Sequence, residues 1–273
     1  MNTFLPSSPE AEHVLHKFWR SLASADQSAL LLDYDGTLAP FCIARDQAVP
    51  YPGVVESLTR IRTLTTTRLI IISGRAIDDL LPLLGLDPPP AIWGCHGWER
   101  LCSDGSRPPV ELPVQARAGL TTAEGWCISQ GLTSCLERKP ASLAVHWRGL
   151  GDQEVHVLRL KVTEGWQSIA RDYGLEIHDF NGGLELRCPG KDKGTSVISI
   201  LKSMRSDMPV AFLGDDLTDE DGFKAIRGRG LGVLVNDQIR PTQALLRLSP
   251  PEELLNFLSV WSQTARPNSK DDS

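Results

Sequence analysis

The sequence predicts an α/β protein built on a Rossmann-like parallel sheet, with an α+β module inserted into it. Three observations predict this class. Short continuous apolar runs alternate with amphipathic helical stretches, as in parallel sheets whose strands are buried on both faces. Reactive side chains directly follow three of these runs. Between residues 103 and 189 the pattern changes to alternating strand segments with a hairpin signal, and afterwards the first pattern returns.

The core elements can be assigned in order along the chain. Val14, Leu15, Phe18 and Leu22 recur at helical spacing, so an amphipathic helix precedes the first strand. Each short apolar run that ends in a polar turn is expected to be a strand, and each longer periodic stretch a helix. The other expected core elements are strands at 29–32, 69–72, 91–93, 209–213 and 231–235, and helices at 54–64, up to 84, 194–202 and 251–261.

The inserted module begins after residues 103–113, a polar segment rich in Gly and Pro that indicates a linker. Strand alternation together with a hairpin signal predicts an antiparallel sheet. The expected elements of the module are a helix at about 114–130, alternating residues at 142–147, a helix at 155–173 and a hairpin around Asn181-Gly182-Gly183. We therefore expect a core of residues 1–103 and 184–273, and an inserted module of residues 104–183.

The composition is that of an ordinary globular protein, with 273 residues of which 41% are hydrophobic and 23% charged. The formal charge of −6 argues against nucleic acid or an anionic membrane as a partner. The first residues lack the pattern of a secretory signal, and the longest apolar runs have the length of strands. Six cysteines without a C-x-x-C pair are typical of reduced thiols. We expect a cytoplasmic monomer with a small-molecule substrate and no nucleic-acid or membrane partner.

Polar side chains follow three of the expected core strands. They are Asp33 and Asp35, then Ser73, then Asp215 and Asp216. Ligands of an open parallel sheet bind beyond the carboxyl ends of its strands. Carboxylates gathered at that edge repel one another unless a cation lies among them. Oxygen ligands without a nearby His or Cys favour a hard ion, so the sequence predicts Mg²⁺.

A lysine and two hydroxyl groups complete a candidate phosphate cradle. Lys193 stands just before an expected helix and can reach the same edge, while Thr37 and Ser73 supply the hydroxyls. Phosphoryl transfer depends mainly on positioning and charge neutralisation. An aspartate can accept a phosphoryl group covalently, and a neighbouring carboxyl group can protonate the leaving oxygen. The constellation therefore predicts phosphoryl chemistry on a small molecule.

Four segments resemble the motifs of the haloacid-dehalogenase-like (HAD) phosphatases, and they occur in the same order: Asp33-Tyr34-Asp35-Gly36-Thr37-Leu38, Ser73-Gly74-Arg75, Lys193-Gly194 and Gly214-Asp215-Asp216-Leu217-Thr218-Asp219-Glu220-Asp221. Three more resemble the trehalose-6-phosphate phosphatases within that superfamily: Gly94-x-His96-Gly97-x-Glu99, Glu137-x-Lys139-x-x-Ser142-x-x-x-His146-x-Arg148 and Glu185-x-Arg187-Cys188-Pro189. The resemblance runs from about residue 30 to residue 261. It implies a HAD core with an inserted C2-type cap domain.

The resemblance also implies a role for each matched carboxylate of the core. Asp33 would be the nucleophile and Asp35 the acid/base. Asp33, the backbone carbonyl of Asp35 and the Asp215 carboxylate would bind Mg²⁺. Asp219 would orient the motif lysine or a metal-bound water, and Asp216 would give further support.

Further matched residues would hold the substrate. Thr37, Ser73 and Lys193 would hold the transferring phosphate, and Lys193 would also stabilise its charge during catalysis. The residues implied to contact the sugar are His96, Lys139, Ser142, His146, Arg148 and Glu185, with His96 and Glu185 near the hinge of the cap. Two tryptophans depart from the family pattern, Trp98 at a normally small position and Trp147 at a tyrosine position, and both could reshape the sugar pocket.

The resemblance implies hydrolysis of trehalose 6-phosphate to trehalose and phosphate through an aspartyl-phosphate. A first alternative keeps the chemistry but changes the substrate to another sugar phosphate, such as glucosylglycerol phosphate or mannosyl-glycerate phosphate, or transfers the phosphoryl group to a second sugar. A second alternative is a non-catalytic phosphosugar-binding regulator. The simultaneous presence of Asp33, Asp35, Lys193 and Asp215 favours catalysis, because a sensor could spare the acid/base.

Overall fold

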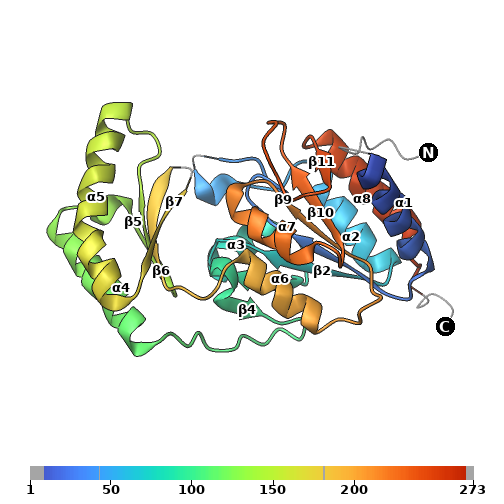
Figure 1. Ribbon diagram of the computed structural model, residues 1–273, viewed down its shortest axis with the longest axis horizontal. Coiled ribbons are helices and arrows are strands. Elements are labelled where there is room, and N and C mark those ends of the chain that lie inside the picture. Colours follow the sequence, from blue (N-terminus) through green and yellow to red (C-terminus); the bar gives the residue numbers. More distant parts are fainter. Residues whose placement is uncertain (1–8, 43, 181, 269–273) are drawn as a thin grey trace. The chain divides into compact units, whose positions relative to one another are not determined.

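A computed structural model of the chain describes residues 9–42, 44–180 and 182–268. The chain divides into two compact units, one formed by residues 1–107 with 192–273 and the other by residues 108–191 (Figure 1). We call the first the core unit and the second the inserted unit, and each is described by itself.

The core unit is organised around a mixed, mostly parallel sheet. Its strands in the described residues lie in the order β11-β10-β9-β1-β2-β3-β4, and each neighbouring pair is parallel except β3 with β4. The strands are β1 (Ser28–Leu32), β2 (Thr67–Ile72), β3 (Ala91–Gly94), β4 (Glu99–Leu101), β9 (Val210–Gly214), β10 (Leu231–Val235) and β11 (Leu246–Leu248). The order places β1 between β9 and β2, so the loops that follow these three strands share one edge of the sheet.

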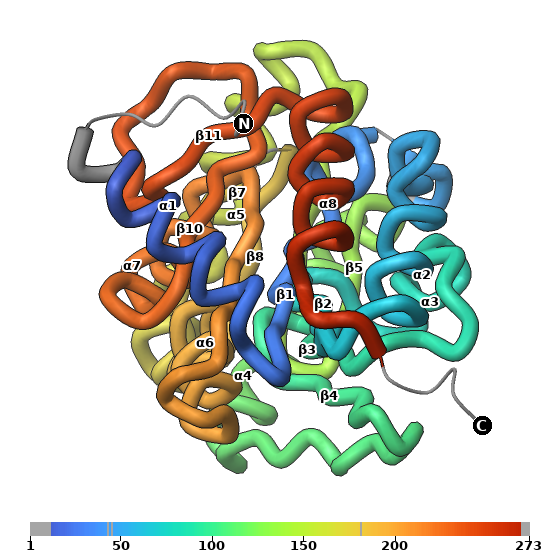
Figure 2. Tube along the Cα trace, turned by 90° about the vertical axis from the view of Figure 1, so that its right-hand side faces the viewer, coloured from blue at the N-terminus to red at the C-terminus, as the bar shows by residue number. Residues whose placement is uncertain are grey.

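Helices cover both faces of this sheet (Figure 2). They are α1 (Pro9–Ser24), α2 (Val54–Leu64), α3 (Ile77–Leu84), α6 (Lys193–Lys202), α7 (Glu220–Ile226) and α8 (Glu252–Thr264). Successive residues of a strand point to opposite faces, so Leu30 packs with α1, α2, α3 and α8, while its neighbour Leu31 packs with α6 and α7. All five residues of β1 are buried for this reason, which explains its continuous apolar run.

The inserted unit is an antiparallel sheet with two helices on one face. The strands β5 (Leu136–Lys139), β6 (Ser142–His146), β8 (Gly183–Arg187) and β7 (Glu176–Phe180) lie in that order. Leu143, Val145 and Leu186 are buried against α4 (Val114–Ser129) and α5 (Asp152–Tyr173). The helices approach closely because α5 has a glycine at residue 165, where a Cβ would lie 1.9 Å from the Trp126 ring. The other face of the sheet is left to polar side chains.

Every strand and helix expected from the core pattern is present, whereas several short elements were not predicted. The strands β4, β5 and β11 have three or four residues each, too few to show periodicity. The units divide at 107/108 and 191/192, whereas the sequence suggested 103/104 and 183/184. The second boundary lies later because β8 pairs with β6 and β7 and so belongs to the inserted unit, whereas a boundary at 183/184 would cut through this strand. Asn181 of the predicted hairpin lies outside the described residues.

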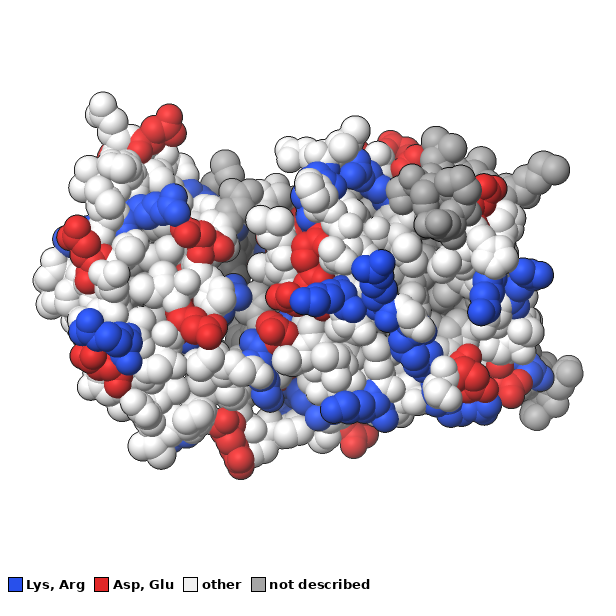
Figure 3. Space-filling view, in the orientation of Figure 1, with Lys and Arg blue, Asp and Glu red and all other residues white. Residues whose placement is uncertain are grey.

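In the part of the chain that the structure describes, no helix combines the length and the apolar character needed to cross a bilayer. Acidic and basic side chains are interspersed over the surface in view (Figure 3).

The burial of β1 yields a test of the core. Replacing Leu31, which is fully buried, by Ala is expected to lower the free energy of unfolding by about 2–5 kcal/mol, because it leaves a cavity between β1 and the α6–α7 layer. Urea titration followed by fluorescence measures the loss. The control Leu64→Ala removes a half-exposed leucine of α2 and is expected to change the free energy by no more than about 0.5 kcal/mol. Equal losses in the two variants would contradict this assignment of the core.

Candidate active site

Three neighbouring strands of the core sheet deliver the predicted reactive groups to one edge. Asp33 follows β1, Ser73 follows β2 and Asp215 follows β9. The Asp33 amide still donates to Leu213 O at 2.9 Å, so the ladder with β9 extends to the first carboxylate. The strand order therefore brings together loops that are far apart in the sequence.

Lys193 joins this edge from the beginning of α6. Its Nζ donates to Asp33 Oδ1 and to Asp219 Oδ1, both at 2.7 Å, and all three side chains are buried. Burial alone lowers the pKa of a lysine, but the two carboxylates outweigh it and raise the pKa of Lys193. The lysine is therefore a cation that bridges two acids. Asp192 caps α6 by accepting from the Thr195 amide at 2.6 Å, which fixes where the helix and its lysine begin.

Asp219 organises the loop that follows β9. Its Oδ1 accepts from Lys193, and its Oδ2 accepts from the amides of Asp215 and Asp216, each at 3.1 Å. Asp219 thus links the lysine to the loop after β9, and its implied role in orienting that lysine stays a prediction. Asp216 caps the short helix η4 (Leu217–Asp219), since its Oδ1 accepts from the Thr218 amide at 2.6 Å. This contact accounts for Asp216 as a local structural support.

The turn after β1 places the predicted residue Thr37, and also Gly36, against the cluster. Thr37 Oγ1 donates to Asp33 Oδ2 at 3.2 Å, and Thr37 is fully buried. Gly36 has φ of 80°, and a Cβ at this position would lie 1.9 Å from Asp215 Oδ2. Only glycine both adopts this left-handed conformation cheaply and leaves room for the Asp215 carboxylate.

The charges in this cluster do not balance without a further cation. One oxygen from each of Asp33, Asp215 and Asp219 lies within 4.8 Å of the other two, and the lysine is the cation that contacts two of them. Burial, and then repulsion between the carboxylates, raises the pKa of Asp215. The pKa of Asp33 is also raised, first by burial and in spite of Lys193. Within the described residues, no hydrogen bond reaches the Asp215 carboxylate.

These residues fit a divalent cation. The candidate ligands are carboxylate oxygens, which hard divalent ions prefer, and Asp215 offers an oxygen that no donor of the described chain satisfies. A bound cation would also relieve the repulsion that raises the two pKa values. The predicted contribution of the Asp35 backbone carbonyl stays a prediction.

Arg75 is a residue of the site to which the sequence gave no role. Its Nε donates to Asp35 Oδ2 at 2.7 Å and its Nη2 to Asp35 Oδ1 at 2.5 Å, a bidentate pair. Its amide donates to the Oγ of Ser73 at 3.1 Å. The signal available in the sequence was the Ser73-Gly74-Arg75 motif, in which the arginine directly follows the predicted phosphate-binding turn.

The loop after β3 packs against the turn formed by Ser73, Gly74 and Arg75. Cys95 and His96 both have positive φ, 49° and 56°, which is uncommon for residues other than glycine. The His96 amide donates to Ser73 O at 3.0 Å, and its ring lies where a Cβ on Gly74 would be, 2.7 Å from His96 Cε1. His96 is thus a buried neighbour of the Ser73 turn. Its implied contact with the sugar stays a prediction.

A second group missed by the sequence holds the loop of Asp215 from the other side. Asn236 Nδ2 donates to Asp215 O at 3.0 Å, and Arg240 Nη2 donates to Asp216 O at 3.0 Å. Arg240 also pairs with Glu220. These residues follow β10, the next strand of the sheet, and nothing in their local sequence indicated that they would reach this loop.

The inserted unit gathers the predicted sugar-contact residues on the polar face of its sheet. Glu185 Oε1 accepts from Lys139 at 3.0 Å and from Ser142 at 2.7 Å, and Glu185 Oε2 accepts from Arg187 at 2.6 Å. Lys139, Ser142 and Glu185 are buried and lie on adjacent strands. Glu185 therefore stands at the centre of this unit's sheet.

His146 lies further along the same face. One of its ring nitrogens, Nε2, is 2.5 Å from Glu137 Oε2, and its Nδ1 is buried without a hydrogen-bond partner among the described residues. Arg148 follows β6 and packs against Gly182, where a Cβ would lie 2.6 Å from Arg148 Cγ. The polar face therefore carries donors and acceptors suited to hydroxyl groups.

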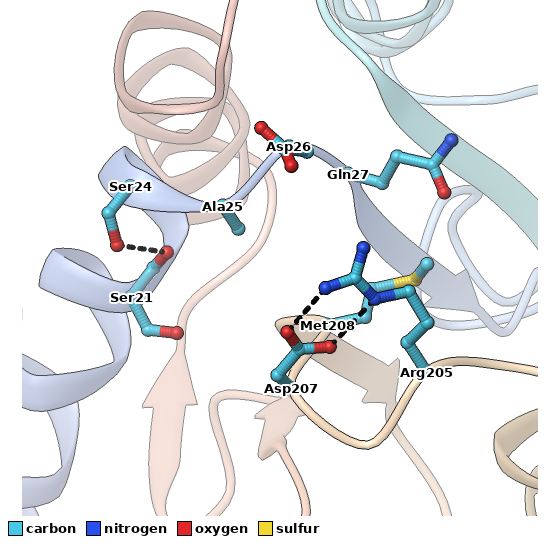
Figure 4. Close-up of a pocket in the computed structure, with 8 residues that line it drawn as sticks. All are labelled: Ser21, Ser24, Ala25, Asp26, Gln27, Arg205, Asp207 and Met208. Carbon is cyan, nitrogen blue, oxygen red and sulfur yellow. Dashed lines mark hydrogen bonds and ion pairs between the residues drawn. The ribbon is translucent and has the colours of Figure 1, made fainter.

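A concave surface at the opposite, amino-terminal edge of the core sheet has none of these features (Figure 4). It encloses about 250 Å³, and its charged side chains are exposed and already paired, Arg205 with Asp207 and Asp26 with Arg266, a residue outside the lining. Its lining residues are Ser21, Ser24, Ala25, Asp26, Gln27, Arg205, Asp207 and Met208. Buried charge, rather than concavity, identifies the candidate active site.

The fold and the site together define a class of protein, the HAD superfamily of phosphatases that the sequence motifs resemble. The chain shares its fold with a phosphatase of that superfamily from Bacteroides thetaiotaomicron, with a TM-score of 0.56, 14% identity and coverage of 87% and 96%. A family model described as trehalose-phosphatase matches residues 31–250. The chain therefore belongs to the trehalose-phosphatase family, and HAD phosphatases of this kind use a divalent metal.

Individual relatives agree with this assignment. The chain is 30% identical to the trehalose-phosphate phosphatase of Mycobacterium avium over 247 residues, which cover 84% of this chain and 60% of that protein. It is 29% identical to the trehalose-6-phosphate phosphatase of Escherichia coli over 89% of this chain and 91% of that one. It shares its fold with the C-terminal domain of the trehalose-6-phosphate phosphatase of Candida albicans, with a TM-score of 0.76, 19% identity and coverage of 96% and 99%. The chain thus spans about 60% of the length of the mycobacterial relative.

Divalent cations are expected to raise the thermal unfolding temperature, and to raise it more at pH 8 than at pH 5. The pKa of Asp33 and that of Asp215 are raised, so the folded protein favours their neutral forms. The metal-free protein therefore loses stability as the pH rises above the ordinary carboxyl pKa of about 4, and a cation offsets that loss. Differential scanning fluorimetry with EDTA or with added Mg²⁺ measures both effects.

The control for this prediction is Asp215→Asn, which removes one candidate ligand and its charge. This variant is expected to show a smaller Mg²⁺ response and a flatter dependence of the unfolding temperature on pH. An Mg²⁺ response as large as that of the unaltered protein would contradict the assignment of Asp215 to the metal site.

Proposed function

We propose that this protein is a Mg²⁺-dependent phosphatase that hydrolyses trehalose 6-phosphate to trehalose and phosphate. The observation that carries the proposal is the buried Lys193 ammonium held 2.7 Å from Asp33 and from Asp219, next to the Asp215 carboxylate. Family membership supports the substrate, and the charge arrangement supports the chemistry.

In the first step, a carboxylate oxygen of Asp33 attacks phosphorus. The bond from phosphorus to the sugar oxygen breaks, and Asp35 gives its proton to that oxygen, so that trehalose leaves and an aspartyl-phosphate remains. Lys193 and the Thr37 hydroxyl keep Asp33 in place, because both contact its carboxylate in the resting protein. Ser73 is the further residue expected to hold the phosphoryl group.

In the second step, Asp35 takes a proton from water and the water oxygen attacks phosphorus. The bond from phosphorus to Asp33 breaks, which returns the Asp33 carboxylate and releases phosphate. Asp35 thereby regains the proton that the next turnover uses. The Lys193 ammonium faces the reacting phosphoryl group throughout, because its partner Asp219 holds it at the edge of the site.

Asp33, Asp215 and the backbone carbonyl of Asp35 are the proposed ligands of Mg²⁺. Bound there, the ion supplies positive charge to the phosphoryl oxygens. Its charge also balances the excess of carboxylates over Lys193 in the cluster.

The inserted unit, residues 108–191, is the proposed specificity cap. Its polar sheet face presents Lys139, Ser142 and Glu185, already linked by hydrogen bonds, together with His146 and Arg148. Such a set of fixed donors and acceptors suits the many hydroxyl groups of a disaccharide. We propose that these residues select the sugar, while the core unit performs the phosphoryl chemistry.

Replacing the nucleophile tests the chemistry. Asp33→Asn is expected to lower kcat for trehalose 6-phosphate by roughly 10³-fold or more, because an amide cannot form the aspartyl-phosphate. Release of inorganic phosphate measures the rate. A matched control, Asp207→Asn, changes an exposed aspartate at the opposite edge of the sheet and is expected to keep full activity. Turnover by Asp33→Asn within about tenfold of the unaltered protein would rule out a covalent mechanism through this residue.

A panel of sugar phosphates tests the substrate. The unaltered protein is expected to have its highest kcat/KM with trehalose 6-phosphate, above glucosylglycerol phosphate, mannosyl-glycerate phosphate and glucose 6-phosphate. Lys139→Ala is expected to raise KM for trehalose 6-phosphate by ~10–100-fold, the effect of a lost charged hydrogen bond, while p-nitrophenyl phosphate, which lacks the sugar, is hydrolysed as before. A higher kcat/KM for another member of the panel would reassign the substrate and leave the phosphatase chemistry intact.

A further inference from the structure

Asp35, the proposed acid/base, is held in the resting protein by two parallel hydrogen bonds from the planar guanidinium of Arg75, an arrangement called here the arginine fork. Arg75 donates from Nε and Nη2 to the two different oxygens of its carboxylate, at 2.7 and 2.5 Å. The Arg75 side chain is 3% exposed, whereas that of Asp35 is 35% exposed. The carboxylate thus faces the open edge of the site, and the guanidinium lies buried behind it.

The Arg75 guanidinium lies near the ring of Tyr34, which is itself held in place by hydrogen bonds. Its central carbon lies 5.6 Å from the centre of the Tyr34 ring, a cation–π distance. Tyr34 is fully buried, and its hydroxyl donates to Ala48 O at 2.7 Å and to Leu83 O at 3.2 Å. Tyr34 therefore cannot turn without breaking hydrogen bonds to a loop residue, Ala48, and to the last turn of α3. The residue between the two aspartates thus contacts the arginine that pairs with one of them.

The backbone of Arg75 is tied to the neighbouring strands as well. Its amide donates to Ser73 Oγ, and its carbonyl accepts from the Cys95 amide at 2.8 Å. Cys95 and His96 have positive φ, so the loop that holds this carbonyl adopts a strained conformation. Loops after β1, β2 and β3 therefore converge on one arginine, whose side chain ends at Asp35.

Both oxygens of Asp35 accept hydrogen bonds from Arg75, and an arginine can only donate. Each oxygen keeps a second lone-pair site, so the carboxylate can meet a leaving oxygen or a water while the pair with Arg75 stays intact. A bidentate pair with a preorganised fork also gives the carboxylate a single orientation, which a lysine would not impose.

We propose that Arg75 is a positioning residue for the acid/base: it holds the Asp35 carboxylate in one orientation, in which the remaining lone pairs of its oxygens can serve the leaving oxygen and then the water. This inference rests on the proposed function, because it requires Asp35 to act on the leaving oxygen. It differs from a phosphate-clamp role, in which Arg75 would contact the phosphoryl group itself.

The two roles predict different dependence on the leaving group. A sugar alkoxide leaves only with a proton, whereas p-nitrophenolate delocalises its charge and leaves without one. Arg75→Gln is therefore expected to lower kcat for trehalose 6-phosphate by roughly 10²-fold, with KM nearly unchanged, and to lower kcat for p-nitrophenyl phosphate by less than about fivefold. Arg75→Lys keeps the charge but loses the fork, and is expected to lower kcat for the sugar phosphate by about tenfold.

A matched control is present in the same unit. Arg205 forms the same kind of fork with Asp207, Nε to Oδ1 at 3.1 Å and Nη2 to Oδ2 at 2.7 Å, on the exposed amino-terminal edge of the sheet (Figure 4). Arg205→Gln is expected to leave both substrates unaffected. If only the Arg75 variants lose activity, the effect comes from the pairing with Asp35 and not from the removal of any arginine–aspartate pair.

Because Arg75 is buried, each variant is also compared with the unaltered protein by thermal unfolding and by its Mg²⁺ response, both of which are expected to be retained in Arg75→Lys. Asp35→Asn is expected to reproduce the leaving-group pattern. The double variant Arg75→Gln with Asp35→Asn is then expected to be no slower on the sugar phosphate than Asp35→Asn alone, because the fork acts through that carboxylate. Should Arg75→Gln fail to fold, Arg75→Lys and its double variant with Asp35→Asn carry the same comparison.

The results that overturn the inference differ from those that overturn the proposed function. If the unaltered protein hydrolyses no phosphomonoester in the presence of Mg²⁺, the proposed function fails. If it hydrolyses another sugar phosphate, the same variants are measured with that substrate. If hydrolysis proceeds but the folded Arg75 variants slow both substrates equally, raise KM for both, or add their effects to those of Asp35→Asn, Arg75 is a phosphate contact or a structural residue and the positioning role is wrong.

Discussion

The buried Lys193 ammonium, 2.7 Å from both Asp33 and Asp219, is the interaction on which the site depends. Burying either carboxylate alone would be costly, and burying the lysine alone equally so. Held together, they fix the turn after β1, the beginning of α6 and the loop after β9 around one point. The excess of acids over this single lysine makes the site receptive to a divalent cation. Under the proposed function, positive charge at this point serves both folding and phosphate binding.

The two units handle polar groups in different ways. In the core unit, three carboxylates surround one bridging lysine, so the site has a surplus of negative charge that a bound cation would balance. In the inserted unit, Glu185 is already satisfied by Lys139, Ser142 and Arg187, so this face offers a hydrogen-bonding surface with its charges paired. Under the proposed function, the first arrangement suits a phosphoryl group and the second suits neutral hydroxyls. The assignment of chemistry to one unit and selectivity to the other follows from this difference.

Much of this could be predicted from the sequence, and the part that could not has a physical reason. Fully buried strands such as β1 show as apolar runs, and groups that follow parallel strands must share an edge, so Asp33, Ser73 and Asp215 were found together. Contacts that depend on three-dimensional neighbours leave no local pattern. The pairing of Arg75 with Asp35, and the reach of Asn236 and Arg240 to the Asp215 loop, are of this kind. The unit boundary moved because pairing of β8 cannot be read from the composition near residue 184.

The insertion of the second unit between β4 and α6 has a consequence for synthesis on the ribosome. Asp33 and its lysine are 160 residues apart, and β9, the neighbour of β1, is translated only after the entire inserted unit. The inserted unit is continuous in sequence and can acquire its contacts while the last strands of the core are still being made. Until β9 has been made, one edge of β1 has no strand to pair with. The nascent chain therefore exposes an apolar strand edge, which is prone to wrong pairing. A ribosome pausing before residue 210 would prolong that interval.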